Sequence, residues 1–484
     1  MIGKKLINPV IAIFILSLLI RLLGSFWGFP GILHNDESNV VRTALGMRFG
    51  NLNPHHFDWP SLSFYVNYFV FWVFIKARIQ LQLLFGIEFL QSQFPFWWNP
   101  EMPFYFLSRA LSALFSAGAG ILVYTASKMV FKNKKLPIIA SIIYSLGYLA
   151  IFFSRYGIHD SMFTFFTFLS FIYSLKILQN GKTKDYVLAA IFAGISTSIK
   201  YNGFLACALI LIAHLYRNKS LKSLFDKKLV ISAIISILIF FVGTPYAIID
   251  YDTFLISNNS QGAIWQMTHM GKALNWGYHL FQSTPKNFGY ISTIIGYFGL
   301  LLILKKGNKS ERLVSFAFLT YVFYIGTWGI AREHCSLPIF PFFAILIAFG
   351  FNKISEYFNL KIFSQIIIVL ILLIEPIKST YLDTNKRLHT DTRVQSGNWI
   401  QQNVPKHENL YINGDQTGYF GGSNPVFDYG DYNILDMQTD NQEEESGHYI
   451  FVEPDKNIIN KFEKCENFIN TNTTGPNISI CFNQ

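Results

Sequence analysis

Two adjacent carboxylates, Asp36 and Glu37, stand where the first apolar segment of the sequence ends. The apolar residues that follow, from Val40 to Phe49, recur at helical spacing, which predicts an amphipathic helix lying on a membrane surface. A carboxylate at the boundary between water and lipid can act as a general base. On periodicity alone the simpler alternative is favoured, in which Asp36 caps the helix and Glu37 favours its dipole.

A third carboxylate, Asp160, follows the polar segment 154–159 and precedes a long apolar run. This position puts Asp160 close to membrane depth, where acidic side chains are costly and are functional candidates by default. The alternative is that Asp160 is the N-cap of the next helix. The neighbouring His159 is interpreted as a packing or hydrogen-bonding residue rather than a catalyst.

Several basic side chains are expected at the same outer interface as these carboxylates. Taken singly, each can snorkel to lipid headgroups. Together, cations around carboxylates also suit an anionic phosphate headgroup. These residues are Arg109, Lys200, Arg332 and His334.

Other kinds of chemistry have weaker support in the sequence. His55 and His56 next to Asp58 are a candidate divalent-metal site, but no third spaced ligand accompanies them. No glycine-rich nucleotide loop, Walker motif or Ser/His/Asp nucleophile order is present, so a soluble ATP or nucleotide-sugar site is not expected. No other cofactor is predicted.

The elements that must position these residues are membrane helices. Of 484 residues, 51% are apolar, 17% are aromatic and only 14% are charged. An ordinary soluble domain has about 25% charged residues. The composition excludes a disordered, collagenous or disulfide-framework protein and predicts a polytopic α-helical membrane protein.

The net charge of +10 is unevenly distributed along the chain. Residues 1–378 carry 32 Lys/Arg and 14 Asp/Glu, whereas residues 379–484 carry 7 and 15. We therefore expect a basic membrane domain that carries the active site, followed by an acidic soluble domain. The basic residues lie in short loops between apolar segments, as the positive-inside rule predicts, so nucleic-acid binding is not inferred.

All the basic loops can lie in the cytoplasm if about eleven spans cross the bilayer. Each span is judged against the ~20 residues that a crossing needs. The expected spans are 7–27, 104–131, 136–154, 161–178, 187–199, 203–216, 229–249, 290–304, 313–331, 336–351 and 362–378. The N-terminus and Lys4-Lys5 then face the cytoplasm, and the tail faces outward. A broken helix at 200–203 satisfies the basic loops on both sides of it.

The large outer elements are a first loop, 28–103, a middle loop, 250–289, and the tail. Within the first loop, the apolar and aromatic residues 61–86 are interrupted by Lys76 and Arg78, which predicts a helix in the outer interface. The tail reads as a small α/β unit with a helix at 393–402 and strands at 410–412 and 449–452. Its Cys465 and Cys481 are a candidate disulfide pair outside the cytoplasm.

The order of several loose motifs resembles a known superfamily of membrane glycosyltransferases. It includes the protein O-mannosyltransferases and the lipid A aminoarabinose transferases and has the GT-C fold. The motifs are Asp36-Glu37, 53–62, the Ser-Arg…His-Asp loop 154–160, 198–203, 243–246, 337–341 and 391–400. Many relatives have a Lys-Pro-Pro-Leu stretch where this chain has 58–62, so one lysine of the pattern is missing.

The resemblance implies a polyprenyl-phosphate sugar as donor and an acceptor outside the cytoplasm, which can be a protein, lipid A or a glycan. It implies that Asp36 is the catalytic base with Glu37 beside it, that Asp160 is a second acidic site residue, and that Arg109 contacts the donor phosphate. It also implies a multi-pass protein of the inner or plasma membrane. The alternative is a transporter or flippase of a lipid-linked sugar or another solute, because Asp160, Lys200 and a broken helix also suit transport.

The charge pattern predicts the side of the membrane that holds the C-terminus. A reporter enzyme that works only outside the cytoplasm, fused after Gln484, is expected to be active. The same reporter fused at Lys306, in a basic loop, is the control and is expected to be inactive, because the positive-inside rule keeps that loop in the cytoplasm. The reverse result would contradict the orientation and the outward active site together.

Overall fold

The computed structural model describes residues 9–48, 50–266, 275–413, 424–436, 447–452, 462 and 464–483. Lys4-Lys5 and Phe49 therefore lie outside the described residues. The chain forms two compact units. The first unit consists of Met1–Leu22, Val40–Phe89 and Leu107–Thr380, and the second consists of Leu23–Asn39, Leu90–Phe106 and Tyr381–Gln484.

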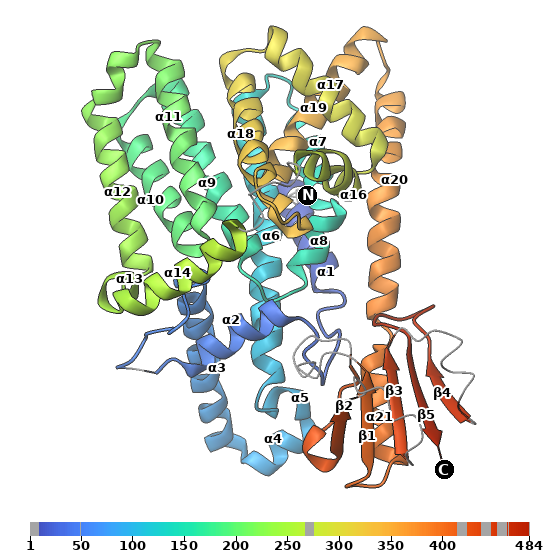
Figure 1. The fold of residues 1–484 in the computed structure, drawn as a ribbon. Helices are drawn as coiled ribbons and strands as arrows, with labels where there is room; N and C mark the ends of the chain where they lie inside the picture. Colours follow the sequence, from blue (N-terminus) through green and yellow to red (C-terminus); the bar gives the residue numbers. More distant parts are fainter. Residues whose placement is uncertain are drawn as a thin grey trace. The chain divides into compact units, whose positions relative to one another are not determined.

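The first unit is built of helices (Figure 1). Within it, α19 packs against α7 and α17, and α10 packs against α9 and α12. The helices up to α20, including those that cross a unit boundary, are α1 (Pro9–Leu22), α2 (Asn35–Gly46), α3 (Leu62–Phe85), α4 (Ile87–Gln93), α5 (Pro95–Trp98), α6 (Met102–Val130), α7 (Leu136–Ser145), α8 (Tyr148–Ser154), α9 (Asp160–Asn180), α10 (Thr183–Ile199), η1 (Tyr201–Phe204), α11 (Leu205–Asn218), η2 (Leu221–Phe225), α12 (Lys227–Gly243), α13 (Tyr246–Ile249), α14 (Tyr251–Gln266), α15 (Trp276–Tyr278), η3 (His279–Ser283), α16 (Thr284–Phe288), α17 (Tyr290–Lys306), α18 (Lys309–Gly326), η4 (Glu333–Ile339), α19 (Phe340–Tyr357) and α20 (Ile362–Arg387).

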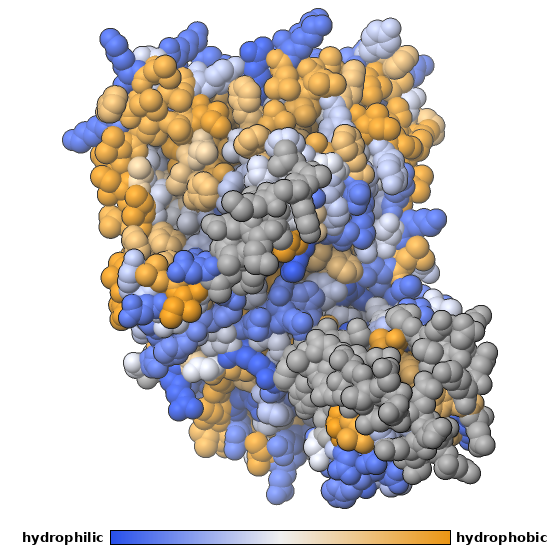
Figure 2. Space-filling model, in the orientation of Figure 1, coloured by the Kyte–Doolittle hydropathy of each residue, from blue (hydrophilic) through white to orange (hydrophobic). Residues whose placement is uncertain are grey.

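Length and composition allow five described helices to cross a membrane, or six if the bent pair α7 and α8 forms one span. Large apolar side chains such as Ile234, Ile237 and Val242 on α12 are exposed on the helical unit, as lipid-facing residues are. Figure 2 shows apolar side chains over much of the face that this view presents. The chain is therefore an integral, multi-pass membrane protein, whereas the count of about eleven spans stays a prediction.

The amphipathic helix predicted after the acidic pair is present as α2 and packs against protein. Val40, Val41 and Ala44 are each at most 1% exposed. Val40 packs in a cluster with Phe64 of α3 rather than against lipid. The helix itself is thus confirmed with its apolar stripe covered by protein, whereas its position at the membrane surface stays a prediction, because an apolar stripe has the same spacing whether lipid or protein covers it. The interfacial position expected for α3 stays a prediction.

The span expected over 136–154 is bent, because α7 and α8 meet at an angle of 52° across a break, and a single broken span over these residues stays a prediction. At the break, the Asn287 Oδ1 atom accepts a hydrogen bond of 3.0 Å from the backbone N–H of Ala150. A Cβ atom at Gly147 would lie 2.7 Å from the Asn287 Nδ2 atom, so only glycine leaves room for the amide. Asn287 therefore satisfies a backbone group that the broken helix leaves open.

The second unit contains a five-stranded sheet with the strand order β2-β1-β3-β5-β4. Strand β1 runs parallel to β2 and β3, whereas β5 runs antiparallel to β3 and β4. The strands are β1 (Asn409–Asn413), β2 (Asn433–Asp436), β3 (Gly447–Val452), β4 (Lys464–Phe468) and β5 (Ile478–Asn483), and the helices of the tail are α21 (Thr392–Asn403) and η5 (Tyr429–Asp431). The helix and the two strands expected in the tail are confirmed.

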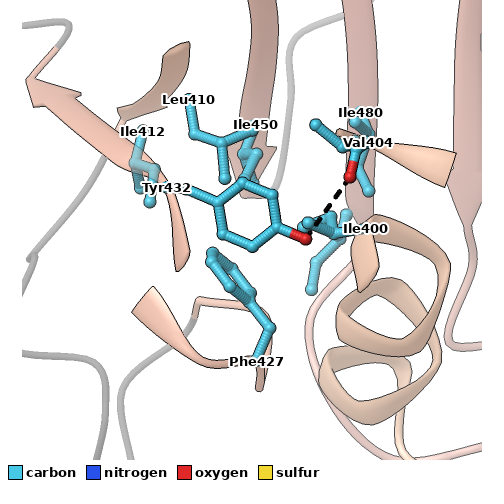
Figure 3. Close-up of a cluster of buried hydrophobic side chains, with 9 residues drawn as sticks. Ile400, Val404, Leu410, Ile412, Phe427, Tyr432, Ile450 and Ile480 are labelled. Atoms are coloured by element: carbon cyan, nitrogen blue, oxygen red, sulfur yellow. Dashed lines mark hydrogen bonds between the residues drawn. The ribbon is translucent and has the colours of Figure 1, made fainter. Parts of the chain in front are cut away.

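An apolar core joins α21 to this sheet (Figure 3). Ile400 of α21 and Ile450 of β3 are fully buried in it, and the Tyr432 hydroxyl donates to the Val404 carbonyl at 3.5 Å. On the sheet, Cys465 and Cys481 face each other across β4 and β5 and form a disulfide. The pairing expected from the sequence is thus confirmed.

The bend between α7 and α8 makes the stability of the first unit depend on Asn287. Asn287→Leu keeps the side-chain size but leaves the Ala150 N–H buried without its acceptor, so the free energy of unfolding is expected to fall by about 1–3 kcal/mol. Unfolding of the purified protein in a denaturing detergent measures this change. Asn180→Leu at the exposed end of α9 is the matched control and is expected to change stability by less than about 0.5 kcal/mol. Equal losses in both variants would refute this role of Asn287.

Candidate active site

A buried ion pair lies at the centre of the candidate site. Asp160 is the first residue of α9, and Lys200 stands between α10 and η1. The Lys200 Nζ atom donates to the Asp160 Oδ1 atom at 2.6 Å, and the two side chains are 14% and 5% exposed. Burial makes each charge dependent on the other, because an uncompensated charge at this depth is strongly destabilising. The structure thus brings together two residues that the sequence analysis identified separately as candidate site residues.

The break predicted at 200–203 is confirmed, and it explains the place of Lys200. Helix α10 ends at Ile199, Lys200 is extended with φ −148° and ψ 132°, and the 3-10 turn η1 follows. A Cβ atom at Gly203 would lie 2.3 Å from the carbonyl carbon of Ser196, so only glycine allows this turn to fold back on α10. The break lets a lysine leave the helix and reach Asp160.

Arg109 is fully buried on α6, beside the segment that precedes α9. Its neighbour Ser108 donates through Oγ to the Gly157 carbonyl at 3.1 Å, and the Ser112 Oγ atom donates to the Ser161 Oγ atom at 3.0 Å. These two contacts hold α6 against the residues on either side of Asp160. Arg109 therefore lies on a stretch of α6 that packs beside Asp160, whereas its contact with a donor phosphate stays a prediction.

The turn η4 brings further charge to this neighbourhood, because it packs against α8 and α9. His334 interacts electrostatically with the Asp160 carboxylate, and its ring lies 5.8 Å from the ring of Phe153. Arg332 precedes η4 and is exposed. Of the predicted cations, Lys200 and His334 thus act on Asp160 electrostatically, and Arg332 lies at the exposed start of the same turn.

An aromatic contact connects the first loop to this site, and the sequence reading did not single it out. The Trp59 ring lies 4.7 Å from the ring of His159 and 5.6 Å from that of His56. Within the described residues neither ring nitrogen of His159 has a hydrogen-bond partner. Burial lowers the pKa of His159 to about 4, although the Asp160 carboxylate opposes this shift. His159 is therefore neutral near pH 7 and packs against Trp59. This agrees with its interpretation from the sequence as a packing residue rather than a catalyst.

The candidate metal residues face different carboxylates. The His55 Nδ1 atom lies 3.6 Å from the Asp250 Oδ2 atom, which also accepts a hydrogen bond from Asn53 at 2.6 Å. The His56 Nε2 atom lies 3.9 Å from the Asp58 Oδ2 atom. No group of three potential ligands occurs in the part of the chain that the structure describes. The two histidines therefore do not converge on one common position.

Asp36 and Glu37 occupy the first turn of α2 and belong to the second unit. Asp36 is half-buried, whereas Glu37 is fully buried. The next residue, Ser38, shares a hydrogen bond of 3.1 Å with the Tyr105 hydroxyl of the same unit. Their place near the start of a helix is confirmed, whereas a common site with Asp160 stays a prediction.

Residues 62–256 match the family model of dolichyl-phosphate-mannose-protein mannosyltransferases. This stretch contains Arg109, Asp160 and Lys200. No curated protein matches the chain in sequence.

Solved structures share the fold, and two of them are an ArnT and an archaeal oligosaccharyltransferase. The chain is similar to ArnT from Cupriavidus metallidurans bound to undecaprenyl phosphate, with a TM-score of 0.54, 10% identity and 97% of each chain covered. It is similar to the oligosaccharyltransferase of Archaeoglobus fulgidus, with a TM-score of 0.51, 12% identity and 85% of this chain covered. It spans 63% of the length of that enzyme. The resemblance to GT-C membrane glycosyltransferases and the predicted fold class are confirmed.

The buried ion pair predicts a specific pattern of stability. Lys200→Met leaves the Asp160 carboxylate buried and uncompensated, so the free energy of unfolding is expected to fall by about 3–5 kcal/mol. The double variant Asp160→Asn/Lys200→Met removes both charges and is expected to recover most of this loss. Denaturation of the purified protein compares the two variants.

An exposed ion pair in the same unit provides the control. Lys286 and Glu333 are also joined at 2.6 Å, but Lys286 is 50% exposed. Lys286→Met is therefore expected to cost less than about 1 kcal/mol. A double variant as unstable as Lys200→Met would show that mutual charge compensation is not what the pair contributes.

Proposed function

We propose that this protein is a membrane glycosyltransferase that moves a sugar from a polyprenyl-phosphate donor to an acceptor outside the cytoplasm. The observation that carries the proposal is the family match over residues 62–256, which contain the buried pair of Asp160 and Lys200. The ArnT structure of the same fold holds undecaprenyl phosphate, which supports a lipid-linked donor. The acceptor class is a protein, lipid A or a glycan. Neither the family model nor the two structures named above is a transporter.

The proposed reaction is a single displacement at the anomeric carbon of the sugar. The acceptor oxygen forms a bond to that carbon while the bond from the carbon to the phosphate oxygen breaks. The polyprenyl phosphate leaves with the bonding electron pair, and Asp36 takes the acceptor proton. Glu37 stands beside Asp36 as a supporting acid. Buried cations stabilise the charge that develops on the leaving phosphate, because a low dielectric strengthens their effect.

Arg109, Lys200, Arg332 and His334 are the proposed phosphate-binding residues. Lys200 is also the ion-pair partner of Asp160. Its charge is therefore held in a fixed direction, which supports a preorganised site. Asp160 then acts as the acidic residue that orients Lys200 for the donor.

We place the reaction on the outer side of the inner or plasma membrane. The uneven charge of the chain supports a cytoplasmic N-terminus and an acidic domain, 379–484, outside the cytoplasm. The disulfide between Cys465 and Cys481 also suits an oxidising compartment. The membrane domain 1–378 then carries the catalytic groups, and the lipid tail of the donor stays in the bilayer.

Asp36 is the residue on which the catalytic proposal is tested. Asp36→Asn keeps the side-chain size and loses only a favourable charge in the first turn of α2, so stability is expected to change little. The transfer rate is expected to fall by roughly 10²–10⁴-fold, the usual contribution of general base catalysis. The assay follows transfer from a radiolabelled polyprenyl-phosphate sugar in membranes that hold equal amounts of each variant.

Two further variants define the result for Asp36. Glu37→Gln is expected to lower the rate less than Asp36→Asn, because its role is supporting. Asp252→Asn changes an exposed acid in the first turn of α14 and is the matched control, expected to transfer sugar at the wild-type rate. If Asp36→Asn also transfers at the wild-type rate, Asp36 only favours the dipole of α2 from its first turn and is not the base.

A further inference from the structure

The segment that leads from the first helix to the acidic pair is held by the C-terminal part of the second unit. Trp27 is 7% exposed, and its indole Nε1 atom donates to the Thr474 Oγ1 atom at 2.5 Å. The Arg387 guanidinium lies over the Trp27 ring at 4.9 Å, and that of Arg393 lies at 6.0 Å. One side chain near the N-terminus thus contacts a loop, the end of α20 and the start of α21.

A second contact lies closer to the acidic pair. A Cβ atom at Gly31 would lie 2.9 Å from the Val426 Cγ2 atom, so the backbone there packs directly on the C-terminal part. Only Ile32, Leu33 and His34 separate Gly31 from α2, and Ile32 and Leu33 are buried. The chain therefore has little freedom between this contact and Asp36.

The loop that receives Trp27 is itself fixed by the residues at the start of α21. The Thr392 N–H donates to the Thr474 carbonyl at 3.0 Å, and the Thr392 Oγ1 atom donates to the Pro476 carbonyl at 2.7 Å. Asp391 is 1% exposed and accepts a hydrogen bond of 2.8 Å from Arg393 Nε. Asp391 and Thr392 therefore fix both the loop and one of the arginines that face Trp27.

We propose that Trp27 and Thr474 are positioning residues, through which the C-terminal domain holds the start of α2 and fixes the direction of the Asp36 carboxylate. This inference rests on the proposed function, because it assigns the purpose of the contact to sugar transfer. A base must be held within a narrow range of positions for proton transfer. The hydrogen bond and the cation–π contacts supply this restraint from residues remote in sequence.

The first test measures motion and does not depend on activity. A spin label is attached at Asn39→Cys, an exposed position on α2, in a chain that also carries Cys207→Ala and Cys335→Ala. Trp27→Phe keeps a ring for the arginines but removes the N–H donor, and Thr474→Val removes the acceptor at equal size. Each variant is expected to increase the mobile fraction of the label. The double variant is expected to add little, because both changes remove the same bond.

The second test measures transfer from a polyprenyl-phosphate sugar with the same variants. The kcat is expected to fall by about threefold to tenfold, the equivalent of one hydrogen bond, while the KM for the donor stays unchanged. Thr474→Ser keeps the hydroxyl that Thr474→Val removes, so its kcat is expected to equal that of the wild-type protein. Trp399→Phe is the matched control, since Trp399 stacks on Phe482 at 6.2 Å within the same unit. It is expected to change neither the label nor kcat.

The outcomes separate the two proposals. An immobile label in Trp27→Phe and Thr474→Val overturns the restraint, and a mobile label with unchanged kcat overturns its role in positioning Asp36. Equal effects in Trp399→Phe would show general loosening of the domain and also overturn the inference. If the wild-type protein transfers no sugar, the proposed function fails, whereas the label still reports whether Trp27 restrains α2.

Discussion

The first unit depends on the mutual compensation of Asp160 and Lys200. Each charge taken alone would carry a large desolvation cost, because Asp160 is buried and the Lys200 side chain is only 14% exposed. The pair therefore fixes the start of α9 relative to the break between α10 and α11. Because α9 also packs on α11 and η4, this contact of 2.6 Å lies where several elements of the first unit meet.

The break at Lys200 and the bend at Gly147 are solutions to one constraint. In an apolar surrounding, a backbone group that leaves a helix needs a new partner. At the first break, η1 continues the backbone bonding, with the Gly203 N–H donating to the Lys200 carbonyl at 2.8 Å. At the second, Asn287 supplies a side-chain acceptor. The first break lets Lys200 reach Asp160, whereas the second changes the direction of the chain between α7 and α8.

Local patterns in the sequence account for one break and not for the other. The break at 200–203 could be predicted because basic loops at both ends of the apolar stretch allow only an even number of crossings. The bend within 136–154 could not, because its acceptor Asn287 lies 137 residues away from Ala150. Asp160 could be found by the cost of charge at membrane depth, and Lys200 by its place at the predicted helix break. Tertiary packing decides their pairing, the contact of Trp59 with His159 and the burial of Val40. The spacing of apolar residues along the sequence does not encode such packing.

The second unit joins the segments Leu23–Asn39 and Leu90–Phe106 to the C-terminal residues, and this arrangement has a consequence for biosynthesis. Trp27 and Thr474 are separated by 447 positions. A ribosome that adds 5–20 residues per second needs roughly 20–90 seconds to cover that distance. During this time the acidic pair has left the ribosome but has not met the loop that Trp27 contacts. The contacts around this segment therefore require the last part of the chain, so a truncated or stalled product lacks the partners of Trp27.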